Sequence, residues 1–542
     1  MLKKMLSLSL CVLVFAGFAA GCSRADNGGT AELKVLAAKE PVSLDPALVG
    51  SAYDASFTAN LFETLVAYTD AAGEKLEVAA AESYAVTEEE IDGALRQVIT
   101  FTIRPSGWSD GVAAKADDFA FAIQRLADPA TGAPYASEIV SRFYMGAEAF
   151  SGKATIEELG VTATDEKTLR CVMAEPRGDN LVLFTAPQLS PVRRDVFELH
   201  GAAWADNAET FVSNGVFELT AATPGDVMLL TKNKNYWYRK YTANGTLSVR
   251  FGDGSSAVQA VRDGEAMVAI GVPAANLGAA QSGGLMQSSA QQSVIVAEMN
   301  HAQAPFNNVK VREAFAKGFD PAAVAVGAAS KPAYALIGGA FATRDVMDYP
   351  ATDLLPKDMQ ARKAEAAAAL AGAGFSGGKG FPSVELLCID GVAERNAADA
   401  LAASWSETLG VEVTVSARDA KSFATALQSG DYQIALTEKF CSFDDPSALL
   451  GLYASGSTAN VSGYDAAKNY DSLLATARAA ADTATRSASL SAAEVVLILE
   501  DFAVAPVCFP STDIVRGAGI SGLRTDALGR FYLENAQAPG AE

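Results

Sequence analysis

Lys439-Phe-Cys-Ser-Phe-Asp-Asp-Pro446 joins the strand-like run Tyr432-Gln-Ile-Ala-Leu436 to the apolar run Ala448-Leu-Leu-Gly-Leu452. Asp445 and Pro446 are typical of a helix N-cap followed by a first-turn proline. The unsatisfied backbone N–H groups at a helix start favour ligand binding, but such a loop is also a common joint between a strand and a helix. This stretch alone leaves both interpretations open.

The segment before this loop alternates strand-like and helix-like patterns. Residues 384–388 and 411–415 are rich in aliphatic side chains, whereas residues 397–409 and 423–427 repeat apolar side chains at helical spacing. This order predicts an α/β layer with partly parallel strands. Ligands of open α/β sheets bind beyond the carboxyl ends of strands, so the loop after the next strand is well placed to contact one.

The N-terminal half has similar patterns. They predict helices within residues 55–68 and 116–126, and strands at residues 33–37, 97–103, 168–172, 214–219, 227–231 and 247–251. A chain of 542 residues exceeds what one hydrophobic core organises. We therefore expect two or three domains.

The N-terminus has the pattern of a lipoprotein export signal. Lys3 and Lys4 precede an apolar run at residues 5–18, and Ala19-Ala-Gly precedes Cys22. Removal of residues 1–21 would leave Cys22 to carry lipid, followed by a polar tether that ends at residue 30; an ordinary secretory signal cut elsewhere is the alternative. No other stretch approaches about 18 consecutive apolar residues. We expect an extracytoplasmic lipoprotein of the cell envelope, anchored in the membrane through Cys22.

The chain carries a formal net charge of −22. Nucleic acid and other anionic surfaces are bound through dense clusters of Lys and Arg, so this balance disfavours them as partners. A neutral or cationic ligand is compatible with it.

Four cysteines remain once Cys11 in the signal and Cys22 are set aside. They are widely spaced and show no C-x-x-C pairing: Cys171, Cys388, Cys441 and Cys508. Disulfides are possible outside the cytoplasm, but buried free thiols are at least as compatible with these spacings.

The sequence has no recognisable catalytic constellation. The two histidines, His200 and His301, are far apart, and no G-x-S-x-G, H-E-x-x-H or Walker motif occurs. Neighbouring carboxylates such as Asp117 and Asp118 point apart on a helix or turn. We expect no enzymatic activity, no metal and no cofactor.

Several phrases occur in a familiar order along the chain. This ordered set resembles the oligopeptide-binding proteins of ABC importers, within the bacterial extracellular solute-binding protein family 5, and the resemblance runs from about residue 33 to about residue 535. The phrases are Pro41-Val-Ser-Leu-Asp-Pro46, Phe62-Glu-Thr-Leu65, Trp108-Ser-Asp-Gly111, Ala127-Asp-Pro-Ala-Thr-Gly-Ala-Pro-Tyr-Ala-Ser137, Asn235-Tyr-Trp237 and Ala304-Pro-Phe-Asn-Asn-Val-Lys-Val-Arg-Glu-Ala314.

The resemblance implies an α/β, two-lobed periplasmic-binding-protein-like fold of cluster C type, with three domains, a hinge and a central ligand cleft. We place domain I at residues 31–66, 191–298 and 504–542, domain II at 67–190 and domain III at 299–503. The lobes would close over an oligopeptide or related solute and present it to the permease subunits of an ABC importer. The receptor is expected to act as a monomer.

The resemblance also implies an altered site for the peptide's amino group. In the family an aspartate of a Trp-x-x-Asp-Tyr pattern meets this ammonium group; here Lys439, Ser442 and Phe443 stand at the Trp, Asp and Tyr positions, and Leu436 replaces an arginine of close relatives. Ser442 can accept a hydrogen bond but cannot neutralise an amine, and Lys439 would repel one. Asp444 could substitute as the anchor.

Other positions are expected to lie in or near the cleft. They are Val49, Gly50, Ser51, Tyr135, Glu394, Phe440 and Phe509. Two alternatives stay open: a family receptor for a non-peptide or N-blocked solute, and a signalling or adhesion receptor that kept the fold.

Overall fold

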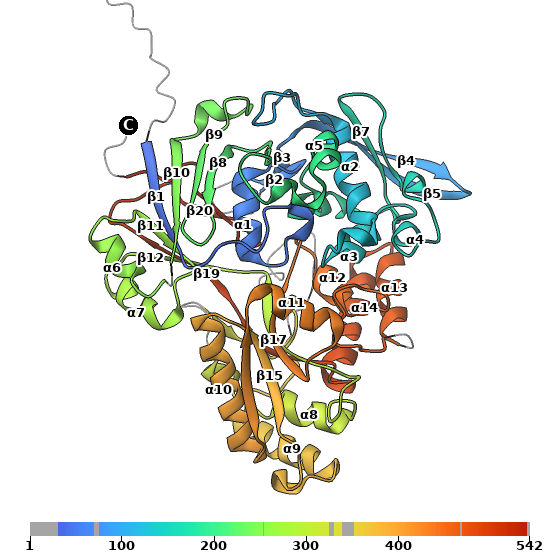
Figure 1. Cartoon of the computed structure of the whole chain (residues 1–542). Helices are drawn as coiled ribbons and strands as arrows, with labels where there is room; N and C mark the ends of the chain where they lie inside the picture. The colour runs from blue at the N-terminus through green and yellow to red at the C-terminus, as the bar shows by residue number, and fades with distance from the viewer. Residues whose placement is uncertain are drawn as a thin grey trace, which may run out of the picture.

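The computed structural model describes residues 31–69, 75–252, 254–324, 330–338, 349, 352–466 and 469–538. The predicted signal, Cys22 and the tether lie outside the described residues. Figure 1 shows a broad upper lobe, made from the N-terminal half and the C-terminal end of the chain, above a narrower lower lobe. The predicted two-lobed α/β fold is confirmed.

Domain I of the upper lobe is built on a seven-stranded sheet in the order β12-β19-β11-β1-β10-β9-β8. β1 (Ala31–Ala37) runs parallel to both neighbours, and its side chains Leu33 and Val35 are buried because helices and loops cover that face. The other strands are β8 (Phe217–Thr223), β9 (Val227–Lys232), β10 (Asn244–Phe251), β11 (Val268–Ile270), β12 (Met286–Ala290) and β19 (Ser511–Arg516). Helices α1 (Ala52–Leu61), α5 (Arg194–His200), α6 (Ala257–Arg262) and α7 (Ala274–Ser282) belong to this domain.

Domain II carries a smaller antiparallel sheet in the order β4-β5-β7-β6. The strands are β4 (Ala81–Ile91), β5 (Ala94–Ile103), β6 (Val161–Ala163) and β7 (Thr168–Val172), and the helices are α2 (Ala116–Ala127), α3 (Ala136–Val140) and α4 (Gly146–Phe150). A short hairpin, β2 (Val66–Tyr68) with β3 (Leu76–Val78), precedes this sheet, and a pair of C-terminal strands, β20 (Arg524–Thr525) and β21 (Phe531–Tyr532), packs near α1.

The lower lobe, domain III, has a six-stranded sheet in the order β14-β18-β13-β17-β15-β16. β15 runs parallel to both β16 and β17, which confirms the predicted α/β layer with partly parallel strands. The strands are β13 (Ser293–Met299), β14 (Lys331–Pro332), β15 (Val384–Ile389), β16 (Val413–Arg418), β17 (Ile434–Phe440) and β18 (Val504–Phe509). Its helices are α8 (Val309–Lys317), α9 (Met359–Gly372), α10 (Val392–Leu409), α11 (Ala420–Ser429), α12 (Pro446–Leu450), α13 (Tyr470–Ala479) and α14 (Thr483–Val495).

The chain crosses between the lobes where strands change sheets. β12 pairs in the upper sheet and β13 in the lower one, so the first crossing lies at residues 291–292; β18 and β19 place the second at Pro510. The predicted borders at 298/299 and 503/504 had left β13 and β18 with domain I. The strand patterns look alike in both sheets, so only the pairing shows that β13 and β18 belong to the lower sheet.

All four cysteines of the described residues are free and buried, as the sequence allowed. His301 is half-buried; the loss of solvent around its ring lowers its pKa to about 4, and its Nε2 lies 3.0 Å from the carbonyl oxygen of Ala503. None of the helices in the described ranges is both long enough and apolar enough to span a bilayer.

Candidate ligand site between the lobes

The loop that follows β17 lies between the two lobes. Asp445 caps α12 by accepting a hydrogen bond from the Ser447 backbone N–H at 2.8 Å, and Pro446 occupies the first turn, so the predicted cap is confirmed. Every residue from Cys441 to Asp445 is buried. A buried polar loop needs partners, and these partners come from all three domains.

Tyr135 ties the three domains together at one point. Its hydroxyl donates a hydrogen bond to the Gly50 carbonyl in domain I at 3.1 Å and accepts one from the Phe440 N–H in domain III at 3.4 Å. Its ring meets that of Phe440 edge-on, with the centroids 6.4 Å apart. Three of the predicted cleft residues therefore meet here.

Gln188 of the upper lobe bridges two further predicted positions. Its Nε2 donates to the Val49 carbonyl at 3.0 Å and to Ser442 Oγ at 3.2 Å. Its Oε1 is buried and has no hydrogen-bond partner within the described part of the chain. A buried acceptor of this kind suits a ligand N–H group.

Asp444 lies at the same boundary. Its carboxylate accepts hydrogen bonds from Tyr68 Oη at 3.0 Å and from Gln292 Nε2 at 2.6 Å. Gln292 lies at the first crossing between the lobes, and its Oε1 is a second buried acceptor without a partner among the described residues. The carboxylate and the two amide oxygens thus flank Ser442 and its neighbours.

Next to this polar group, Asp445 joins a buried ion-pair network across the lobes. Its carboxylate lies 3.4 Å from Arg142, 3.4 Å from Arg177 and 2.6 Å from Arg486. Burial alone would raise the pKa of Asp445, but the three guanidinium groups hold it well below its ordinary value. Burial and the neighbouring Arg177 lower the pKa of Arg142 to about 10.

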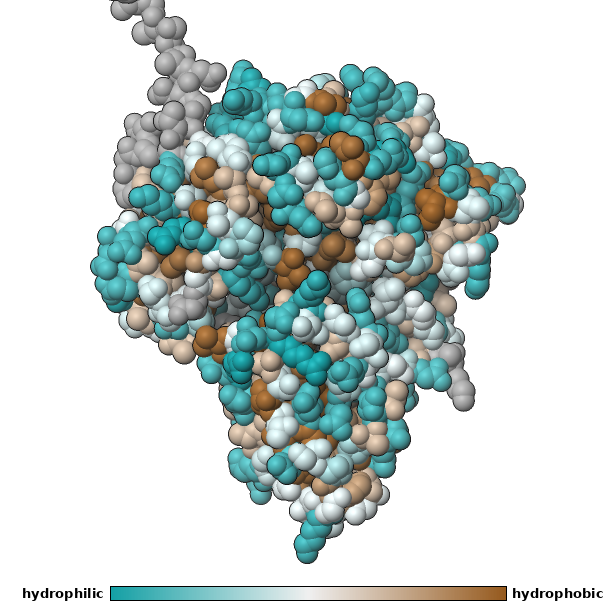
Figure 2. Space-filling view, viewed as in Figure 1, coloured by the Kyte–Doolittle hydropathy of each residue, from teal (hydrophilic) through white to brown (hydrophobic). Residues whose placement is uncertain are grey.

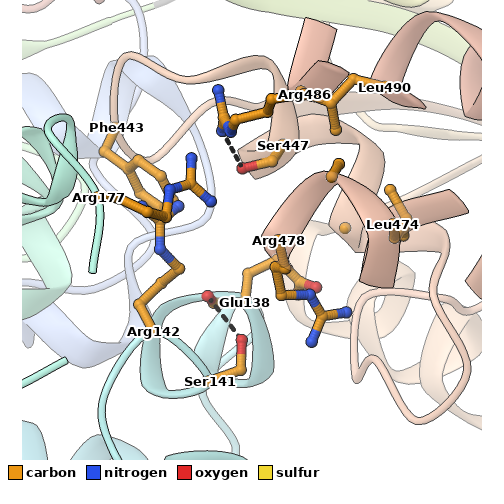
Figure 3. A pocket seen from close by; sticks show the side chains of 12 residues that line it. Glu138, Ser141, Arg142, Arg177, Phe443, Ser447, Leu474, Arg478, Arg486 and Leu490 are labelled. Carbon is orange, nitrogen blue, oxygen red and sulfur yellow. Dashed lines mark hydrogen bonds between the residues drawn. The ribbon is translucent and has the colours of Figure 1, made fainter. Parts of the chain in front are cut away.

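A cavity of about 40 Å³ opens beside this network. Arg142 and Arg177 reach it from domain II, and Arg478 and Arg486 from α13 and α14 of the lower lobe (Figure 3). Glu138 also lines it, and burial raises the pKa of this carboxyl to about 7. The cavity is therefore rich in guanidinium groups and could receive a small anionic group.

Lys439 lies away from this boundary. Its Nζ is 2.9 Å from Glu298 Oε2 and 5.3 Å from the centre of the Tyr453 ring, inside the lower lobe. Glu298 therefore compensates the charge that was expected to repel an amine. Leu436 is likewise buried in the lower core.

The remaining predicted positions are spread along the contact between the lobes. Glu394, at the start of α10, forms an ion pair with Lys39 of domain I at 3.2 Å. Ser51 caps α1, and the backbone N–H of the next residue, Ala52, lies 3.4 Å from Glu438 Oε1 in the lower lobe. The Arg142 guanidinium lies over the ring of Phe443, and its Cζ is 5.4 Å from the centre of that ring. Phe509 ends β18, next to the second crossing.

A second opening lies further along the same boundary. A cavity of about 210 Å³ is lined almost entirely by alanine side chains, which come from α7 in the upper lobe and from α10 and Ala323 in the lower lobe. Figure 2 shows the lobes in contact, with the surface hollowed between them near the middle of this face. The lobes thus enclose a boundary that is polar near the loop and apolar further along.

The sequence analysis did not predict five residues of the site, which are Gln188, Gln292, Arg142, Arg177 and Arg486. None of them belongs to a motif that marks a binding site in the sequence. Buried Arg and Gln cannot be told from exposed ones without the fold.

Two lobes that are joined by two strand crossings and close over a shared polar boundary define a solute-binding protein. The family profile described as bacterial extracellular solute-binding proteins, family 5 Middle, matches residues 76–461. The chain belongs to this family of solute-binding proteins. It is a binding protein, not an enzyme.

Individual relatives agree with this assignment. The probable deoxycholate-binding periplasmic protein YgiS of Escherichia coli K12 is 30% identical over 468 residues, 84% of each chain. The structure of Haemophilus influenzae OppA in complex with RPPGFSPFR superposes with a TM-score of 0.83 at 25% identity, over 94% of this chain and 98% of that one.

The arrangement of the lobes resembles that of the peptide complex. Against the unliganded open form of the murein tripeptide binding protein MppA, the TM-score is only 0.62 at 22% identity, although the alignment covers 93% of this chain and 97% of that one. In this chain the two lobes contact each other at Tyr135, Gln188 and Asp445.

Proposed function

We propose that this protein is the lipid-anchored substrate-binding component of an ABC importer, which captures oligopeptides between its lobes and delivers them to a membrane permease. The observation that carries the proposal is the meeting of Gly50, Tyr135 and Phe440, which brings the loop after β17 against both upper domains. A ligand held there would contact both lobes and stabilise the closed form. Family membership and the peptide named in the OppA complex support an oligopeptide.

The backbone groups at this junction suit an extended peptide. The Val49 and Gly50 carbonyls accept hydrogen bonds from the side chains of Gln188 and Tyr135, and the Phe440 N–H donates one to the Tyr135 hydroxyl. Side chains can turn away, and a peptide backbone could then pair with the exposed groups. Such backbone pairing would select peptides by their length rather than by their sequence.

Asp444 is the proposed partner of the peptide's amino group. It lies two residues from Ser442, and the buried oxygens of Gln188 and Gln292 can accept the remaining ammonium protons. Neutral donors such as Tyr68 and Gln292 hold the carboxylate in place. This arrangement would move the amine anchor along the loop instead of abolishing it.

A second candidate ligand is an acidic solute without a free α-amine. Ser442 provides no charge for an amine, whereas four arginines line the cavity beside Phe443. The name of the relative YgiS refers to deoxycholate, an amphipathic carboxylate. The alanine-lined cavity between α7 and α10 would suit its apolar body.

Thermal-shift measurements distinguish these candidates, because a ligand that binds the folded state raises the melting temperature. The purified protein is titrated with pools of free peptides, the same pools N-acetylated, and deoxycholate. A larger rise in melting temperature with the free peptides supports Asp444 as the partner of the amino group. Equal rises with both pools support a site that does not recognise the amino group. A shift with deoxycholate alone supports the second candidate and rejects the peptide proposal.

The lipid anchor at Cys22 is tested separately. In cells fed an alkyne-tagged fatty acid, the wild-type chain should become labelled and remain with the membrane fraction, and Cys22→Ala should lose the label. Labelling of the Cys22→Ala chain would reject this site. Copurification with a permease from cross-linked membranes tests the importer, and gel filtration tests the proposed monomer.

A further inference from the structure

One segment departs from the acidic character of the chain. The chain has 64 Asp and Glu against 42 Lys and Arg, yet no acidic residue occurs between Asp226 and Asp253. Within this segment, residues 232–241 read Lys-Asn-Lys-Asn-Tyr-Trp-Tyr-Arg-Lys-Tyr. Four cationic and four aromatic residues thus occur among ten positions of a chain whose formal charge is −22.

The fold displays part of this segment on the surface. Tyr241 is 65% exposed and Tyr238 is 43% exposed, and their ring centres lie 4.4 Å apart. Lys234, Arg239 and Lys240 are exposed beside them. We call these five residues the basic-aromatic patch.

Trp237 fixes the patch to the body of domain I. Its Nε1 donates to Glu63 Oε2 at 2.8 Å, and the Arg104 guanidinium lies 3.9 Å from its ring centre. Its ring also lies 4.9 Å from that of Tyr238. The contacts of Trp237 therefore hold the neighbouring exposed rings against the body of the domain.

The patch lies beside the point where the chain would leave for the membrane. Asn244, three residues after Tyr241, is the register partner of Ala31, the first described residue (β1 and β10 in Figure 1). Cys22 precedes Ala31 by nine residues, which span at most about 30 Å when fully extended. A lipid on Cys22 would thus keep this edge of domain I near the bilayer.

We propose that the basic-aromatic patch docks on the phospholipid surface and orients the receptor, an inference that rests on the proposed lipid anchor. Lys234, Arg239 and Lys240 would meet lipid phosphates, and Tyr238 and Tyr241 would lie at the headgroup level, where amphipathic rings are favoured. The acidic remainder of the surface is repelled by anionic lipids. Attraction at one edge and repulsion elsewhere select one orientation of the lobes above the membrane.

Tryptophan fluorescence tests this contact. Trp108, Trp204 and Trp405 are fully buried, so Trp237 is the tryptophan beside the patch that brominated lipids can reach. The lipidated protein, purified from its own membrane, is reconstituted into phosphatidylcholine–phosphatidylglycerol vesicles containing brominated chains. We expect quenching that disappears in Trp237→Phe and is reduced several-fold in the triple variant Arg239→Ser, Lys240→Ser, Tyr241→Ser.

The matched control is the triple variant Tyr84→Ser, Lys379→Ser, Lys421→Ser, which removes one exposed ring and two exposed cations elsewhere. It should be quenched like the wild type. Equal quenching of the patch variant and the wild type, or no quenching of vesicle-bound wild type, overturns the proposal. Vesicle flotation tests the lipid anchor separately. If the protein does not float with the vesicles, the proposed anchor is rejected. The contact of the patch is then measured by quenching at high concentrations of the same vesicles.

Discussion

The carboxylate of Asp445 in the lower lobe lies 3.4 Å from the guanidinium group of Arg142 in the upper lobe. Both side chains are buried: Asp445 is 2% exposed and Arg142 is 7% exposed. The same aspartate caps α12 and meets Arg486 of its own lobe. One residue therefore both caps a helix and joins the two lobes.

We expect Asp445→Asn to open the receptor. Asparagine preserves the helix cap, but three buried guanidinium groups lose a counter-charge, and breaking a buried pair costs about 3–5 kcal/mol. The melting temperature should fall, and small-angle scattering should show a larger radius of gyration. Asp482→Asn, at the exposed cap of α14, is the matched control and should change neither. An unchanged radius for Asp445→Asn would exclude a role in closure.

Glu138 should make stability depend on pH near neutrality. Its pKa is raised to about 7 by burial, so the folded protein holds this proton more tightly than the unfolded chain, where the value is 4.5. Its contribution is then fully present below pH 4.5 and is lost as pH rises toward 7, by about 1–3 kcal/mol. Glu138→Gln should remove this slope in urea titrations at pH 5 and pH 8, whereas Glu148→Gln, at an exposed position of α4, should retain it.

A carboxylate at position 442 should strengthen the dependence on a free amine. We expect Ser442→Asp to increase the preference for free over N-acetylated peptide about tenfold, because a buried carboxylate compensates an ammonium group. Calorimetric titration with one peptide pair measures the ratio. Ser442→Asn, similar in size but neutral, is the control. The same ratio in both variants would mean that the amine binds elsewhere.

Lys439 should stabilise the lower lobe without selecting the ligand. Lys439→Met leaves Glu298 buried without its 2.9 Å partner, which costs about 3–5 kcal/mol. Adding Glu298→Gln should recover most of this loss in denaturant unfolding. The ratio of free to acetylated peptide affinity should stay that of the wild type in the double variant. A change in the ratio of free to acetylated peptide affinity would show that Lys439 does influence ligand selection.

The sequence predicted the local features of the site correctly. Asp445 and Pro446 start a helix, strands and helices alternate before them, and the ordered phrases identify the family. Each depends on side chains close together in the chain, where backbone preference and hydrophobic spacing act directly.

The partners across the boundary could not be predicted in this way. Gln188 meets Ser442 although 254 positions separate them, and Arg142 meets Asp445 across 303. Such pairs follow from how whole domains pack, and a single buried Arg or Gln leaves no periodic signal.

By itself, the sequence determined the family, the α/β class and the helix cap at Asp445. The tertiary structure alone decided that β13 and β18 belong to the lower lobe, that Glu298 compensates Lys439, and that Arg142 and Arg177 meet Asp445. The physical reason is the range of the interactions. Caps and periodicity act within a few residues, whereas the order of strands and the pairing of buried charges are fixed only when distant segments pack together.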